Sequence, residues 1–172
     1  MTIAPPPTIA SAAPGGALAP ARAPRDRRGP GALGRLLAGL RDPVERCWRT
    51  IAVTDRFEAW VVAWPVGGAI ELHDHGRAGG VVVVASGSLV ETTLHADADG
   101  GQSVRSTTVP TGEHVLLGPD HVHDIINEGP GPALSVHVYT PALGTMTFFD
   151  RGPAGGLVAV RTEHYLDGNR VG

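Results

Sequence analysis

The chain has 172 residues, a formal net charge of −3 and 42% hydrophobic residues. This length is typical of one globular domain, and the acidic balance argues against a generally basic nucleic-acid binder. No stretch approaches the roughly 20 consecutive apolar residues that a membrane span needs. We therefore expect a globular monomer with no nucleic-acid or membrane partner.

Cys47 is the only cysteine of the sequence. A single thiol excludes a disulfide within one chain and fits a reducing compartment. We therefore expect a cytoplasmic protein in which Cys47 is a buried thiol rather than a nucleophile.

The first 33 residues are rich in alanine, proline and glycine, with arginine interspersed. Proline removes backbone donors and fixes φ, so such a segment sustains neither a helix nor a sheet. The composition therefore predicts a disordered tail over 1–33 and a folded domain over 34–172. A short amphipathic helix is predicted over about 33–41 from leucines at the spacing i, i+3, i+4 and i+7, namely Leu33, Leu36, Leu37 and Leu40.

From residue 49 onward the sequence changes to short runs of Val, Ile and aromatic residues. Glycine, proline, aspartate and asparagine separate these runs, and this alternation is typical of an all-β sandwich or barrel. The strands are predicted within 57–64, 79–94, 114–119, 123–127 and 133–141.

The first chemical motif is His73-Asp74-His75. On a strand, side chains at i and i+2 point to the same face, so the two imidazoles can converge while Asp74 points away. Two imidazoles aimed at one point can form half of a metal site, although a pair of structural histidines would give the same pattern.

A second motif follows about fifty residues later, in the run from Gly118 to His123. It supplies a third imidazole, which would complete a three-histidine set for a divalent ion. His121 and His123 share a face if the strand is regular, so geometry alone does not choose between them.

Together these motifs resemble the double motif of the cupin superfamily. Within it, the run W-P-x-G-x-x-x-x-x-H-D-H-G from Trp64 to Gly76 and the run S-V-H-V-Y-T-P from Ser135 to Pro141 resemble cysteine dioxygenase and its thiol dioxygenase relatives. The likeness spans about residues 45–150. It implies a cupin-type double-stranded β-helix, a jelly-roll barrel, so that the fold class is all-β with a short N-terminal helical segment and a disordered N-terminal tail.

The resemblance also implies one Fe(II) per chain, held by three neutral histidines. By motif position these are His73, His75 and His123, the last because Asn127 follows it by four residues. Many cupins add a glutamate shortly after the paired histidines, but here that stretch reads GRAGGV. Three neutral ligands would leave the full charge of the metal to attract a thiolate and then dioxygen.

Ser135, His137 and Tyr139 stand at i, i+2 and i+4 of one predicted strand and therefore share a face. A hydrogen-bonded relay of these three would hold the phenol near the metal. The resemblance implies that they are catalytic residues and that Tyr139 also orients the bound substrate. Some relatives carry a cysteine, crosslinked to this tyrosine, at the position that is Gly80 here, so we expect a free phenol.

The family holds the substrate carboxylate with an arginine shortly before the first barrel strand. Arg49 is the match by position, with Arg46 and Arg56 as rivals. Guanidinium suits this task because it binds a carboxylate through two parallel hydrogen bonds and keeps its charge. Many relatives have a tyrosine two residues before this arginine, where this chain has Cys47.

These motifs predict an iron-dependent dioxygenase that adds both atoms of O2 to a small thiol. L-cysteine is the expected substrate and cysteine sulfinate the expected product. One alternative is 3-mercaptopropionate dioxygenase. An alternative of another class is a cupin that binds a metal or small ligand without catalysis.

Overall fold

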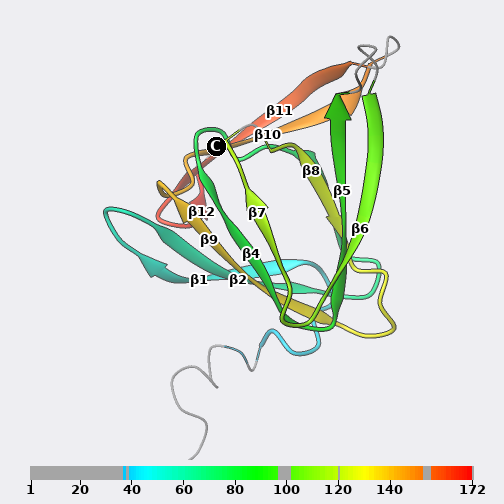
Figure 1. Ribbon diagram of the computed structural model, residues 1–172. Helices are drawn as coiled ribbons and strands as arrows, with labels where there is room; N and C mark the ends of the chain where they lie inside the picture. Colours follow the sequence, from blue (N-terminus) through cyan, green and yellow to red (C-terminus); the bar gives the residue numbers. More distant parts are fainter. Residues whose placement is uncertain (1–36, 38, 97–101, 120, 153–155, 172) are drawn as a thin grey trace, which may run out of the picture.

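The computed structural model describes residues 37, 39–96, 102–119, 121–152 and 156–171. Within them the chain forms two antiparallel sheets that face each other as opposite walls of one barrel (Figure 1). One sheet contains five strands in the order β1 (Cys47–Val53), β2 (Glu58–Trp64), β9 (Ala133–Thr140), β4 (Gly79–Ser86) and β7 (His114–Leu117).

The second sheet contains seven strands. They are, in spatial order, β12 (Asn169–Arg170), β11 (Leu157–Leu166), β10 (Thr145–Arg151), β3 (Ala69–His73), β8 (His123–Ile126), β5 (Ser88–Ala96) and β6 (Gln102–Pro110).

In the described part of the chain, no helix is long and apolar enough to cross a bilayer.

The core lies between the two sheets, because alternate side chains of each strand point inward. Trp60, Val62 and Trp64 of β2 belong to the same buried cluster as Ile125 and Phe148 from the other sheet. This inward face of β2 is strongly aromatic, and it forms one wall of the interior that the site occupies.

The predicted tail over 1–33 lies outside the described residues, as does most of the predicted helix over 33–41. Leu37 and Leu40 are described, and they pack on the outer face of β2 against Val61 and Ala63. Because this segment covers its outer face, β2 is buried on both sides.

Strand β9 carries polar side chains into the barrel. Its buried positions alternate with half-buried ones, and Ser135, His137 and Tyr139 all point inward. The opposite face of β9 carries Leu134 and Val136, which pack against the outer cluster that contains Leu40. The period-two pattern of β9 therefore aims three polar groups at the same interior.

A β-bulge in β3 sets the direction of the first histidine. Ile70 and His73 are three residues apart and both buried, which strict alternation along a strand would forbid. The pairing of β3 with β8 shifts register between these two residues, so that β3 carries one extra residue there. Such a bulge re-aims the side chains beyond it, and here it turns His73 inward.

Gly80 on β4 is paired with Tyr139 of β9. A Cβ atom at this position would overlap the carbonyl oxygen of Val138, which is backbone and cannot rotate away. The strand therefore needs glycine at residue 80, and a cysteine there would force the two strands apart.

We expect Gly80→Ala to lower the free energy of unfolding by about 1–3 kcal/mol, since overpacking costs about this much. The measurement is the urea midpoint at unchanged m-value. Gly118→Ala is the matched control, because nothing lies within 4 Å of a Cβ added there. Equal midpoints for the two variants would contradict the close approach of β4 and β9.

Candidate active site

Three buried histidines meet between the sheets. β3 and β8 place His73 directly opposite His123, and His75 lies two residues beyond the end of β3. One nitrogen of each lies within 4.8 Å of those of the other two. The ring centroids are 4.8 to 5.1 Å apart, so the structure brings the three predicted ligands to one point.

The turn after β3 directs His75 inward. The carboxylate of Asp74 points away from the three histidines and accepts hydrogen bonds from the backbone N–H groups of Gly76 and Thr147, both at 3.0 Å. Gly76 has φ of 56°, a conformation that favours glycine. A Cβ there would also overlap the hydroxyl of Thr145. In the H-D-H-G run, the two histidines therefore join the cluster, while the aspartate and the glycine stabilise the turn that places them.

The nitrogens of this cluster suit a divalent metal. His73 Nδ1 donates to the carbonyl oxygen of Glu71 and His123 Nδ1 to the carboxylate of Glu91, both at 2.8 Å, so each keeps its Nε2 lone pair free. His123 Nε2 and His75 Nδ1 are buried with no hydrogen-bond partner within the described residues. Burial lowers the pKa of all three histidines, so they are neutral. Neutral, unpaired and buried nitrogens fit a metal ligand set.

His121, the rival of His123, lies outside this cluster. It precedes β8, is half-buried, and its Nε2 donates to the carboxylate of Glu91 at 2.8 Å. The two histidines do not share a face, because residue 121 belongs to the loop and the strand begins only at His123.

The predicted relay is present on the inner face of β9. Ser135 Oγ lies 2.8 Å from His137 Nε2, and His137 Nδ1 lies 3.0 Å from the hydroxyl of Tyr139. The indole N–H of Trp64 extends the relay by donating to Ser135 Oγ at 2.9 Å. Burial lowers the pKa of His137 to about 3, so this imidazole is neutral.

The direction of the relay follows from its first member. An indole N–H can only donate, so Ser135 Oγ accepts from Trp64. The other hydrogen-bond partner of this hydroxyl in the described chain is His137 Nε2, so the serine hydrogen is donated there. The single N–H of the neutral imidazole then lies on Nδ1 and donates to the oxygen of Tyr139. This leaves the phenolic hydrogen free, on a ring whose centroid is 5.4 Å from that of His75.

A small cavity of about 20 Å³ adjoins the histidines. His73, His137 and Tyr139 reach it, and the rest of its wall combines aromatic and aliphatic side chains with one arginine. Its other aromatic and charged lining residues are Arg46, Trp48, Trp60, Trp64 and Tyr165.

Arg46 is the cation of this cavity. Its guanidinium lies 5.7 Å from the ring centroids of both Trp48 and Trp64, a distance at which cation–π attraction acts. Burial lowers its pKa, while nearby Tyr165 and Tyr139 oppose the shift. Arginine keeps its charge under such conditions.

The structure does not bring Arg49 to the cavity. Arg49 is exposed on β1 and does not line the cavity. Trp48 turns inward and stacks on Trp60 at 5.8 Å, so Arg46, two residues earlier, is the arginine on its side of the chain. Arg56, the other rival, is exposed in the turn before β2.

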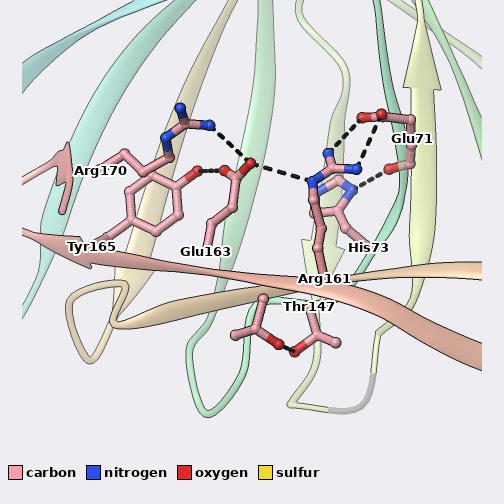
Figure 2. Close-up of polar contacts among 8 residues, drawn as sticks. Glu71, His73, Thr147, Arg161, Glu163, Tyr165 and Arg170 are labelled. Atoms are coloured by element: carbon pink, nitrogen blue, oxygen red, sulfur yellow. Dashed lines mark hydrogen bonds and ion pairs between the residues drawn. The ribbon is translucent and has the colours of Figure 1, made fainter. Parts of the chain in front are cut away.

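Tyr165 is a wall residue that the sequence analysis missed. Figure 2 shows its hydroxyl donating to Glu163, at 2.8 Å. Glu163 in turn accepts from Arg170 at 3.0 Å and from Arg161 at 3.4 Å. Nothing in the sequence near Tyr165 marks it, and Trp60, whose ring centroid lies 5.5 Å from that of Tyr165, is more than a hundred residues away on β2.

The same network reaches the first histidine. Arg161 pairs with the carboxylate of Glu71 at 3.0 Å, and the backbone carbonyl of Glu71 holds His73 (Figure 2). Arg161 also stands 3.6 Å above the ring centroid of Phe148. Strand β11 is therefore tied to β3 across β10, and this fixes the position of Tyr165.

The phenol of Tyr139 has no thiol near it. Cys47, the chain's single cysteine, packs on the outer face of the five-stranded sheet against Leu40 and Val61. Gly80 occupies the position across from Tyr139. A crosslink between Tyr139 and a cysteine of the same chain is therefore excluded.

Two facing sheets around a histidine cluster define a cupin-type double-stranded β-helix, as predicted. The protein TT1209 from Thermus thermophilus aligns with a TM-score of 0.50 and 19% identity, over 59% of this chain and 88% of that one. An oxalate oxidase in complex with glycolate aligns with a TM-score of 0.52 and 24% identity, over 62% of this chain and 56% of that one. At these identities the likeness shows the fold alone.

The chain belongs to the cysteine dioxygenase type I family, whose model matches residues 35–152. Membership supports a thiol dioxygenase that uses a small thiol and O2, with the three-histidine cluster as a candidate metal site. Strands β11 and β12, and with them Tyr165, follow the matched segment.

The sequence has two tyrosines, and burial raises the pKa of both, with Glu163 raising that of Tyr165 further. We therefore expect no phenolate absorbance in the native protein near pH 10, where exposed tyrosines are about half ionised. The stability gained from two neutral phenols is complete below about pH 10 and is lost as the pH rises above it.

The measurement is an ultraviolet titration of the native protein, with the denatured chain as the reference. Tyr165→Phe isolates the signal of Tyr139. A native midpoint equal to that of the denatured chain would show that neither phenol is buried as described.

Proposed function

We propose that this chain is a non-haem Fe(II) dioxygenase that converts L-cysteine to cysteine sulfinate. The observation that carries the proposal is the meeting of two polar systems at one small cavity. The three-histidine cluster and the Ser135–His137–Tyr139 relay both reach it. A protein that only binds a metal has no need of such a relay.

We assign His73, His75 and His123 as the ligands of one Fe(II) per chain. Imidazole also accepts other divalent metals, so the assignment of iron rests on family membership. Fe(II) would supply the redox chemistry that lets dioxygen react with a thiolate. The reaction balances without a further reductant, since sulfur loses four electrons, O2 gains four, and both oxygen atoms remain on sulfur.

Tyr139 is the group of this chain that acts on the reacting atoms. His137 donates to its oxygen, so the phenolic hydrogen is free to be donated to substrate. Because burial raises the pKa of Tyr139, the phenol keeps this hydrogen at neutral pH. Ser135 and Trp64 hold the imidazole in the tautomer that the relay requires.

Arg46 is the proposed anchor of the substrate carboxylate. Its guanidinium lies 5.7 Å from the ring centroids of Trp48 and Trp64, and the wall of the same cavity includes Tyr139 and His73. A substrate whose carboxylate pairs with Arg46 can therefore present its sulfur to the histidines.

One observation favours 3-mercaptopropionate as a second candidate substrate. The described residues that line the cavity include no aspartate or glutamate. The chain therefore offers no carboxylate to the ammonium group, which is the group that distinguishes cysteine from 3-mercaptopropionate.

Oxygen consumption by the iron-loaded protein tests the proposal. L-cysteine, 3-mercaptopropionate and cysteamine are offered separately, and the product mass is followed in parallel. We expect uptake with L-cysteine and a product that has gained two oxygen atoms. Preference for 3-mercaptopropionate would replace the substrate. No uptake with any thiol, with iron demonstrably bound, would favour a binding protein over an enzyme.

Arg46→Ala should lower kcat/KM for L-cysteine about 10- to 100-fold, because a hydrogen bond between charged groups contributes about 1.5–3 kcal/mol. Turnover of cysteamine, which has no carboxylate, should change far less. Arg49→Ala is the matched control and should change neither, since Arg49 is exposed. An equal loss for both thiols would remove Arg46 from carboxylate binding.

A further inference from the structure

A carboxylate lies directly behind the third histidine of the cluster. Glu91 Oε1 accepts a hydrogen bond from His123 Nδ1 and another from His121 Nε2, each at 2.8 Å. Glu91 belongs to β5, which pairs with β8 so that Glu91 stands opposite Ile125. The carboxylate therefore reaches His123 from the neighbouring strand.

The three histidines differ in what stands behind them. His73 donates to a neutral backbone carbonyl, that of Glu71. His75 Nδ1 has no partner within the described residues. Only His123 donates to a carboxylate. Such a partner fixes the tautomer and orientation of a ligating imidazole and makes it a stronger donor to a metal.

Glu91 is held in a confined position. Its side chain is only 11% exposed, and its hydrogen-bond partners in the described chain are the two imidazole N–H groups. Both hydrogen bonds are accepted by the same oxygen, Oε1. His123 Nε2, the other nitrogen of that ring, is buried with no partner in the described chain, as expected of an imidazole that a carboxylate orients toward a metal.

His121 holds the carboxylate from the solvent side. It is half-buried and lines a surface groove together with Glu91, Arg105 and His114. Its hydrogen bond restrains the rotation of Glu91, and its ring packs 4.7 Å from that of His123. His121, the alternative third ligand, therefore contacts the cluster indirectly, through Glu91.

We propose that Glu91 is a positioning residue of the metal centre, which orients His123 and places a negative charge behind it, and that His121 holds Glu91 in place. The inference rests on the proposed metal site. It changes the expected character of that site, since three neutral ligands would then be supplemented by one carboxylate outside the ligand set.

The test is the equilibrium affinity for Fe(II) of the purified full chain, measured without oxygen by competition with a chelator. We expect one Fe(II) per chain in the wild type. Glu91→Gln keeps the size of the side chain and removes its charge, and should weaken binding about 10- to 100-fold. Glu91→Asp should restore part of the loss, and His121→Asn should weaken binding by less than Glu91→Gln.

Glu113→Gln is the matched control. It makes the same substitution at an exposed glutamate in the turn before β7, which belongs to neither candidate metal group. Its affinity for Fe(II) should equal that of the wild type. Thermal unfolding of each metal-free variant separates a loss of fold from a loss of metal binding. The absorption spectrum of the Co(II)-loaded protein should shift in Glu91→Gln and not in Glu113→Gln.

Wild-type affinity in Glu91→Gln would overturn the proposal. So would two metal ions per chain that fall to one in this variant, because Glu91 would then be a ligand of a second ion. If the wild type itself binds no Fe(II), the proposed function fails as well. Where the wild type does bind Fe(II), His75→Ala locates the ion, because His75 belongs to the three-histidine cluster and not to the group of Glu91, His121 and His123. Loss of binding in this variant places the ion at the three-histidine site, and retained binding would overturn the proposal.

Discussion

The bulge in β3 is the constraint on which the whole centre depends. It allows Ile70 and His73 to point inward although they are three residues apart. Without the extra residue, His73 would follow the alternation of β3 and face solvent, because a shift of one residue moves a side chain to the other face. His73 could then not stand beside His123 across the strand pair, and His75 would leave the interior with it.

The interior is unusually polar for a barrel core, and its polar groups are held in order by one another. Trp64, Ser135, His137 and Tyr139 form a continuous relay in which every member has a partner. Buried polar networks are stabilising only when they are fully satisfied. The two buried imidazole nitrogens without partners, on His75 and His123, therefore stand out as the place where a ligand belongs.

The sequence predicts those parts of the site that depend on local periodicity. His73-Asp74-His75 and Ser135-Val136-His137-Val138-Tyr139 were recognisable because each set lies within a few residues on one strand or the turn after it. The spacing of the sequence could not decide whether His121 or His123 is the third ligand, because the answer depends on where β8 begins. The placement of Arg49 outside the cavity has a related cause. Trp48 turns inward and stacks on Trp60, so its neighbour Arg49 points to the opposite face of β1.

Other parts of the site could not be read from the sequence, because distant strands bring them together. Glu91 reaches His123 only through the pairing of β5 with β8. The absence of a glutamate after the paired histidines suggested a site without a carboxylate, yet Glu91 supplies one outside the ligand set. Glu91 comes from β5 and contacts His123, rather than following the paired histidines His73 and His75 in the sequence.

Family membership constrains the residues of the candidate metal centre more closely than the residues that would contact the substrate, because part of the cavity wall lies outside the matched segment. The three histidines, the relay and Arg46 all fall within residues 35–152, the segment shared with the family. Tyr165 comes from β11, which lies beyond that segment, and it closes the cavity against Trp60 at 5.5 Å between ring centroids. Relatives that share the centre can carry a different side chain at this wall. The fit of a particular thiol is therefore set partly by residues that family membership does not constrain.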